Sequence, residues 1–364
     1  MIAASSTLFR YISRQFLASF IVLMTSLLGI LLLFDVIEML RRAAAQPDVP
    51  LGLILSMSLM KLPTLGQSIL PMVILFTAIH TCWKLNKTSE LVVIRSFGLS
   101  VWQFLSPMLL CALLIGIFST AVVNPVSSIF LSKHNRLDNL HFQGARDPVA
   151  VSKTGIWLRQ PSEQGYALIH SESFDKKQWQ LNNVTILFFD DANAFLSRMD
   201  SPVAYLREGY WEIRQPLVSD RNGSRRFDIQ KLQTELTAQK IEESFADPET
   251  ISFWNIPEYI RIMEETGFPA TRLYVHFHTL LAQPFFFIAM VLLAATFSLH
   301  PPRFGGGASM IVLGIAAGFF IFFMESMLQA FGISQKIPAH LAAWSPSIIG
   351  LLLGVTALLH LEDG

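Results

Sequence analysis

The uncharged run LASFIVLMTSLLGILLLF, residues 17–34, decides the fold of this chain. A helix needs about 20 apolar residues to cross the hydrocarbon core of a bilayer, and this run carries no charged side chain over its length. Arg10 and Arg14 precede the run, and no obvious small-residue cleavage site follows it. We therefore expect a retained membrane-spanning helix and not a cleaved signal peptide.

Five further stretches are long and apolar enough to cross a bilayer in the same way. They are residues 51–79, 101–123, 273–299, 308–330 and 341–361. The first of these contains Lys61, Pro63 and Pro71, and the second is closed by Asn124-Pro125. A hydrophobic content of 52% agrees with this assignment, because soluble domains carry less apolar sequence. The chain is therefore predicted to form a membrane α-helical bundle of six transmembrane helices.

A polar segment, residues 131–268, separates the third span from the fourth and carries 36 of the 54 charged residues. Short alternating runs broken by turn residues indicate β-strands in this segment. The predicted strands are residues 154–159, 165–170, 184–189, 204–207, 210–214 and 227–232. Helical spacing returns at residues 256–266. We predict an inserted all-β, jellyroll-like domain. The segment contains no cysteine, so its core must stabilise it without a disulfide.

The predicted organisation has three parts: residues 1–130 with spans one to three, residues 131–268 with the β domain, and residues 269–364 with spans four to six. Cations in short loops set the orientation of such a protein. On the side of the N-terminus these are Arg10, Arg14, Lys84, Lys87, Arg95 and Arg303. On the opposite side they are Arg41, Arg42 and Lys336. We expect both termini in the cytoplasm and the β domain outside, which in a bacterium is the periplasm.

Ionisable residues at or inside the spans are candidate functional groups. Arg41 and Arg42 follow the first span on the side that is poor in cations. They are either snorkelling residues at a helix end or a docking point for the phosphates of a lipid headgroup. Lys61 and Glu325 lie within the second and fifth spans, where they are either hydrated near an end or part of a proton pathway.

Motifs for catalysis, metal binding and nucleotide binding are absent from the sequence. The glycine-rich stretch at residues 305–309 lacks the lysine of a phosphate-binding loop. Neither a nucleophile elbow nor a Cys/His group at metal-ligand spacing occurs. We expect a non-catalytic protein without a cofactor of its own, which takes its energy from a partner or from an ion gradient.

The loop between spans two and three, KLNKTSELVVIRSFG at residues 84–98, is named here the coupling loop. Ser89 is a candidate cap, Glu90 begins a short amphipathic turn, and Gly98 ends it. A short helix at the cytoplasmic face is what a transport permease presents to a motor subunit, with Glu90 and Arg95 as polar contacts. The alternative is an interfacial helix without a partner.

The motif SELVVIRSFGLS, residues 89–100, resembles the coupling helix of the permeases that export lipopolysaccharide, the LptF/LptG family. Three spans, a periplasmic β domain and three further spans match that family over essentially the whole chain. Local features most resemble the LptG branch. These are EMLRR at residues 38–42, GIWL at 155–158, YALI at 166–169 and the approach to span four at 256–284.

The resemblance implies a permease subunit in the bacterial inner membrane that extracts lipopolysaccharide from the outer leaflet. The implied partners are an LptF-like second permease, a dimeric LptB-like ATPase that binds the ATP, and LptC/LptA-like periplasmic bridge proteins, with no nucleic acid. Glu90, Arg95 and Gly98 would engage the ATPase. The residues implied to meet the lipid headgroup are Arg41, Arg42, Lys133 and Arg136, although the last two lie one residue farther from Pro125 than in the family. Glu325 falls where the family also places an acid.

Three other functions stay open from the residues alone. The first alternative is that the chain is an LptF-type sibling or a permease for another lipid. A membrane-anchored periplasmic scaffold or sensor would have the same spans but no need for the Glu90 loop. A membrane-tethered hydrolase is disfavoured by the missing catalytic motifs.

Overall fold

The computed structural model describes residues 2–44, 49–90, 96, 100–143, 149–152, 155–162, 165–175, 178–190, 194–220, 223–234, 247–265, 267, 269–299 and 307–363. The chain divides into two compact units. The helical unit comprises Met1–Phe142, Glu249–Trp254 and Thr271–Gly364, and the β unit comprises Gln143–Pro248 and Asn255–Ala270. The sequence placed these boundaries near residues 131 and 268. The difference at the first boundary arises because the third span is longer than predicted.

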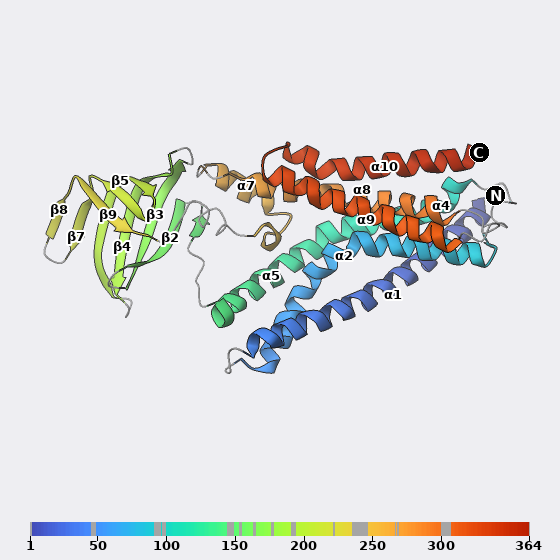
Figure 1. The fold of residues 1–364 in the computed structure, drawn as a ribbon, viewed down its shortest axis with the longest axis horizontal. Coiled ribbons are helices and arrows are strands. Elements are labelled where there is room, and N and C mark those ends of the chain that lie inside the picture. Colours follow the sequence, from blue (N-terminus) through green and yellow to red (C-terminus); the bar gives the residue numbers. More distant parts are fainter. Residues whose placement is uncertain are drawn as a thin grey trace. The chain divides into compact units, whose positions relative to one another are not determined.

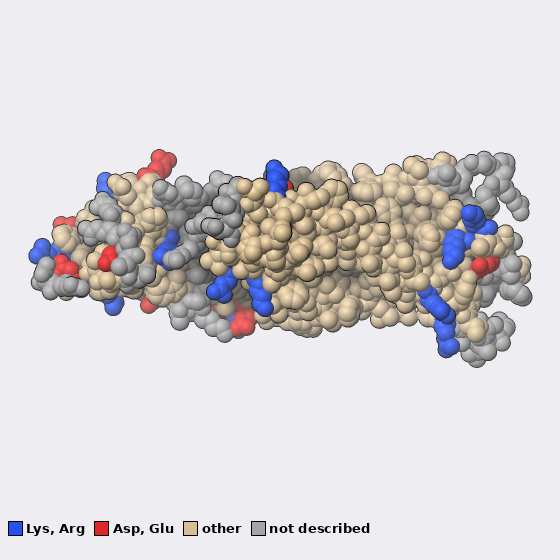
Figure 2. All heavy atoms as spheres, turned by 90° about the horizontal axis from the view of Figure 1, so that it is seen from below, with Lys and Arg blue, Asp and Glu red and all other residues tan. Residues whose placement is uncertain are grey.

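The helical unit contains six helices that are long and apolar enough to cross a membrane, which confirms the predicted spans. Their elements are α1 (Ile2–Ala43), α2 (Leu51–Lys87), α4 (Val101–Phe118) with η1 (Ser119–Val123), α5 (Asn124–Asp138) and η2 (Asn139–Gln143), α8 (Thr271–Ser298), α9 (Gly307–Ile333) and α10 (Ala339–Asp363). The chain begins and ends at the same end of this unit (Figure 1), as an even number of crossings requires. Figure 2 shows a long band of the unit's surface without charged side chains, with the charges gathered towards its ends.

Helix α8 forms the centre of the helical unit. Phe286, Phe287 and Met290 are buried there against the other helices. Gly116 on α4 faces Pro284 on α8 so closely that a Cβ atom would lie 2.5 Å from the proline Cα. A glycine is therefore required where these two helices cross.

Helix α1 is packed very differently. Only Ile12, Phe16 and Met39 are buried among its described side chains, and none of residues 17–38 is. An exposed apolar helix surface is expected in lipid or against another membrane protein. The middle of α1 contacts the core through one face, where Phe20 and Met24 are partly buried, and leaves its other apolar side chains exposed.

The third span does not end at Asn124-Pro125, as the sequence predicted, but continues through η1 into α5. Pro125 lacks the N–H that would bond the carbonyl of Ala121, four residues earlier. That carbonyl accepts a hydrogen bond from Trp254 Nε1 at 3.2 Å. The backbone N–H of Asn124 bonds Ser119, five residues back, which is the spacing of a π-helical turn. The helix therefore absorbs the proline because a distant indole satisfies the freed carbonyl.

The β unit is a nine-stranded antiparallel sheet in the order β1-β2-β3-β4-β5-β6-β9, with β7 beside β5 and β8 beside β7. Its strands are β1 (Val149–Ser152), β2 (Gly155–Ser162), β3 (Gly165–Asp175), β4 (Gln180–Asp190), β5 (Phe195–Arg207), β6 (Tyr210–Arg214), β7 (Leu217–Asp220), β8 (Gly223–Arg226) and β9 (Ile229–Gln233). The six predicted strands fall in β2 to β6 and β9, and the predicted helix is α7 (Ile256–Glu265). The inserted all-β domain is thereby confirmed.

The sheet curls so that β2 approaches β6 and β9, which are distant from it in strand order. The buried side chain of Gln160 on β2 makes this closure. Its Nε2 donates to the carbonyl of Gln233 at 3.0 Å, and its Oε1 accepts from Trp211 Nε1 at 3.2 Å and from Thr234 Oγ1 at 2.8 Å. The buried amide of Gln160 therefore links β2 to β6 and to the end of β9 by three hydrogen bonds.

Candidate functional site

The end of the helical unit away from the chain termini brings α1, α2 and α5 together (Figure 1). Met39 of α1 and Met57 of α2 lie in a small apolar cluster, against which Leu137 of α5 packs. His134 of α5 is buried and its Nδ1 donates to the carbonyl of Met57 at 3.0 Å. This packing places the charged residues of three helices around one end. We call the five cations there, Arg41, Arg42, Lys61, Lys133 and Arg136, the cationic rim.

Arg41 and Arg42 share one carboxylate, that of Glu38. Arg41 donates from Nε and Nη2 to the two oxygens of Glu38, each at 2.9 Å, and Arg42 Nε donates to Oε1 at 3.2 Å. Arg42 also lies 3.5 Å from the Asp138 carboxylate on α5. The side chain of Arg41 is nevertheless 77% exposed, so its guanidinium stays accessible to an anionic ligand.

Lys61 on α2 is paired with Asp35 on α1, and the sequence analysis did not identify this pair. Lys61 Nζ donates to Asp35 Oδ1 at 2.9 Å. The Asp35 side chain is 9% exposed, and its other oxygen, Oδ2, is buried with no hydrogen-bond partner in the described part of the chain. The charge of Lys61 inside an apolar span is therefore balanced by a carboxylate.

Lys133 and Arg136 are exposed on the surface of α5. Neither forms an ion pair with any residue that the structure describes. The cationic rim thus sets five cations against the three carboxylates of Glu38, Asp35 and Asp138, a surplus of two positive charges. Such a surplus suits an anionic group at a membrane surface.

Glu325 is not part of this arrangement. Gln329, one turn later on α9, donates to Glu325 Oε1 at 3.2 Å. Within the described ranges no cation forms an ion pair with Glu325. The structure therefore does not bring Lys61 and Glu325 together as a relay.

The described part of the coupling loop, residues 84–90 and 96, lies at the opposite end of the helical unit. Glu90 accepts a hydrogen bond from the Tyr11 hydroxyl at its Oε2, at 3.0 Å, and from Thr88 Oγ1 at its Oε1, at 2.9 Å. Ser89, predicted as a cap, has a left-handed backbone with φ +59° directly after the last turn of α2. Glu90 and Ser96 have helical conformation. Arg95 and Gly98, the other predicted coupling residues, lie outside the described residues.

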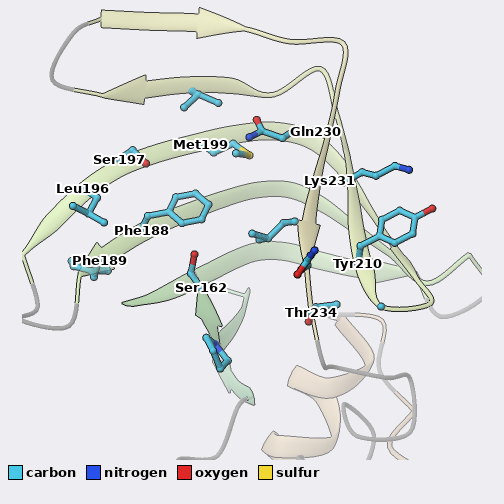
Figure 3. Close-up of a pocket in the computed structure, with 15 residues that line it drawn as sticks. Ser162, Phe188, Phe189, Leu196, Ser197, Met199, Tyr210, Gln230, Lys231 and Thr234 are labelled. Atoms are coloured by element: carbon cyan, nitrogen blue, oxygen red, sulfur yellow. The ribbon is translucent and has the colours of Figure 1, made fainter. Parts of the chain in front are cut away.

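The curled sheet of the β unit lines a half-open cavity of about 880 Å³ (Figure 3). Its apolar lining includes Phe188, Leu196 and Met199. Gln230 also lines it, and its buried Oε1 has no hydrogen-bond partner among the described residues. The lining also includes polar side chains such as Ser197, Lys231 and Thr234, so the cavity is suited to a ligand with both apolar and polar groups.

Of the carboxylates in the site, only Glu38 carried a signal in the sequence for its pairing. Glu38 stands three and four residues before the two arginines, which is the spacing of helical ion pairs. Asp138 follows Lys133 and Arg136 on the same helix, but its pairing with α1 has no local signal. The contact of Tyr11 with Glu90 spans 79 residues and could not be read from spacing.

These features define a multi-pass membrane protein with six spans, a β domain inserted after the third span and a cationic rim at one end of the helices. Residues 10–360 match the family described as lipopolysaccharide export system permease LptF/LptG, and the chain belongs to that family. The family resemblance expected from the coupling-loop motif is confirmed.

Individual relatives are similar over nearly their whole length. The LptG permease protein of Haemophilus influenzae is 22% identical over 357 residues, which cover 96% of this chain and 97% of that protein. The LptG permease protein of Escherichia coli K12 is 21% identical over 365 residues, with the same coverage. The similarity therefore includes both groups of spans and the β unit.

Proposed function

We propose that the chain is the LptG-type permease subunit of an ATP-driven exporter of lipopolysaccharide. In this proposal it extracts the lipid from the outer leaflet of the inner membrane and passes it to a periplasmic bridge. The observation that carries the proposal is the cationic rim, whose Lys133 and Arg136 have no ion-pair partner among the described residues. A lipid with several acyl chains and phosphates needs apolar helix surface beside accessible cations, and this end of the unit offers both.

The energetics of the substrate explain why a motor is needed. Exposure of each buried CH₂ group to water costs about 0.8 kcal/mol, so a lipid with many acyl carbons does not leave a bilayer unaided. The sequence has no phosphate-binding loop, and the ATP would be bound by a dimeric LptB-like ATPase. Glu90 would meet this ATPase at the coupling loop, together with Arg95 and Gly98.

The proposed orientation puts both termini and the coupling loop in the cytoplasm. The cationic rim then lies at the outer leaflet, where Arg41, Arg42, Lys133 and Arg136 would meet phosphates of the lipid. The β unit lies in the periplasm, and the apolar part of its cavity lining, which includes Phe188, Leu196 and Met199, would contact acyl chains. The excess of loop cations on the side of the N-terminus supports this orientation.

The remaining partners follow from the exposed surface and the family. The exposed apolar face of α1, which includes Val22, Leu33 and Phe34, would be covered by an LptF-like second permease. LptC/LptA-like bridge proteins would receive the lipid from the β unit. A scaffold or sensor would use the β unit alone and would not need an acidic side chain held in the coupling loop.

Affinity purification from the native membrane tests this proposal, with protein and lipid mass spectrometry on wild type and Glu90→Arg. Glu265→Arg, at an exposed position of α7, is the matched charge-reversal control. We expect wild type and control to bring a second permease, an ATPase and lipopolysaccharide, and Glu90→Arg to lose the ATPase. Recovery of the chain alone, or an ATPase that Glu90→Arg retains, would contradict the proposal.

A further inference from the structure

We propose that Tyr11 is the positioning residue of the coupling loop: its hydroxyl orients the Glu90 carboxylate and ties that loop to α1. This inference rests on the proposed function and adds a residue and a route of force transmission to it. It is drawn from one contact between the first turns of α1 and the loop after α2.

The carboxylate of Glu90 is held at both oxygens by neutral donors. The Tyr11 hydroxyl donates to Oε2 at 3.0 Å, and Thr88 Oγ1 donates to Oε1 at 2.9 Å. Hydroxyl donors fix the direction of a carboxylate without neutralising it, and each oxygen keeps a second acceptor site. Glu90 is thereby oriented and still able to accept hydrogen bonds from a cationic side chain of the ATPase.

The two donors differ in what they connect. Thr88 is two residues from Glu90 and fixes the carboxylate only within its own loop. Ser89, between them, holds the left-handed backbone that turns the chain out of α2. Tyr11 belongs to another helix, so its hydrogen bond joins the coupling loop to α1.

Helix α1 is continuous from Ile2 to Ala43 and therefore reaches from this contact to the cationic rim. At its far end, Asp35 pairs with Lys61 and Arg42 pairs with Asp138. Between the two ends α1 packs along one face: Phe20 and Met24 are partly buried against the main core, and Ser19 Oγ lies 3.2 Å from His80 Nδ1 of α2. A displacement of the coupling loop by the motor would reach the rim through Tyr11 and α1.

The position of Tyr11 lets the hydroxyl be removed without loss of the fold. The ring itself is 45% exposed, while the neighbouring Ile12 and Phe16 are fully buried and anchor this part of α1. Tyr11→Phe keeps the ring and deletes only the donor. Tyr205→Phe is the matched control, because the Tyr205 ring is contacted by Arg207 and Arg214 through its face.

The experiment uses the purified complex in proteoliposomes with lipopolysaccharide as the probe, and it measures ATP hydrolysis and ATP-dependent lipid release separately. For Tyr11→Phe we expect unchanged complex assembly and thermal stability, and a fall in lipid released per ATP of roughly 3–10-fold, the typical net effect of one lost hydrogen bond. Tyr205→Phe should match wild type. In a Glu90→Gln background, Tyr11→Phe should have no further effect, because the oriented charge is already gone.

Two results would overturn the inference. One is release per ATP in Tyr11→Phe equal to wild type, and the other is an undiminished effect of Tyr11→Phe in the Glu90→Gln background. Both leave the proposed function intact, because the wild-type complex still couples ATP to release. A wild-type complex that hydrolyses ATP without releasing lipopolysaccharide would overturn the proposed function as well.

Discussion

Lys61 of α2 and Asp35 of α1 form an ion pair of 2.9 Å that joins the first two spans within the cationic rim. Asp35 is nearly buried, and its second carboxylate oxygen has no hydrogen-bond partner in the described part of the chain. Lys61 is therefore the cation that pairs with this carboxylate within the apolar spans. The packing of α1 against α2 is therefore stabilised in part by an ion pair.

Lys61→Met should destabilise the helical unit, because it leaves the Asp35 carboxylate without its cation. We expect a cost of about 1–3 kcal/mol, between the values for exposed and for fully buried ion pairs. Denaturant unfolding in detergent measures it. Lys61→Met with Asp35→Asn should recover most of the loss, since no uncompensated charge then remains. Equal stability of Lys61→Met and wild type would show that the ion pair does not contribute to the free energy of unfolding.

Glu38→Gln should raise the affinity of the protein for lipopolysaccharide. The substitution releases Arg41 and Arg42 from the carboxylate they share, and a cation near a lipid surface contributes about 1 kcal/mol, so we expect a gain of roughly 2–5-fold. Binding in detergent at low and high salt measures it, and the gain should shrink at high salt. Glu264→Gln, on α7 in the β unit, serves as the control. An unchanged or weaker affinity would mean that Glu38 does not compete with the lipid.

Gln160→Leu should loosen the β unit and leave the helical unit unaffected. It removes the partner of Trp211, Thr234 and the Gln233 carbonyl at once, and buried polar groups without partners cost about 1–3 kcal/mol each. Amide hydrogen exchange should show faster exchange in β2, β6 and β9. Gln178→Leu, at an exposed turn position, should leave exchange unchanged. Protection of β9 equal to wild type would refute the role of Gln160 in closure.

Trp254→Phe should weaken the third span at its π-helical turn, because the Ala121 carbonyl loses its donor. We expect about 0.5–1.5 kcal/mol, the net value of one hydrogen bond. Pro125→Ala gives the helix back the N–H that this carbonyl lacks, so Trp254→Phe should cost less in that background. Thermal unfolding of wild type, the two single variants and the double variant measures this coupling. Additive effects would show that the indole and the proline are not linked.

Acid should destabilise the β unit through Glu212. The hydrogen bond from Arg214 lowers the pKa of Glu212 below its usual value, and the nearby charge of Arg207 acts in the same direction. A carboxyl whose pKa is lower in the folded state stabilises it above the unfolded pKa, and this stabilisation is lost as the pH falls through the folded pKa. The thermal midpoint of Arg214→Gln should therefore fall less with acid than that of wild type. Arg226→Gln, on the exposed β8, should follow wild type, and equal pH slopes for Arg214→Gln and wild type would contradict this assignment.

The spans and most strands were predictable because they depend on local pattern. Six apolar runs define the helices, and alternation with turn residues defines six of the strands. Strands β7 and β8 are only four residues long and β8 is fully exposed, so they lack the alternation that marks a half-buried strand. The length of the third span was not predictable, because the donor that rescues the helix at Pro125 is Trp254, over a hundred residues away.

In the candidate site, too, features set by local sequence were predictable and features set by tertiary packing were not. Arg41, Arg42 and Lys61 were singled out by their positions at or inside the spans, whereas Lys133 and Arg136 were named from the family resemblance. Glu38 lay within helical reach of Arg41 in the sequence. The partners Asp35 and Asp138 depend on which helices pack together, and the contact between Tyr11 and Glu90 depends on where two helix ends meet. A single sequence gives the charges of such a site, whereas tertiary packing gives their pairing.

The central claim is that this chain moves lipopolysaccharide out of the inner membrane. The most direct measurement is pulse labelling of newly made lipopolysaccharide in cells depleted of the protein, followed by separation of the two membranes. We predict that labelled lipopolysaccharide stays in the inner membrane within one doubling, while newly made outer-membrane proteins still arrive, and that wild type restores export but Glu90→Arg does not. Normal arrival of labelled lipopolysaccharide at the outer membrane in depleted cells would contradict the account.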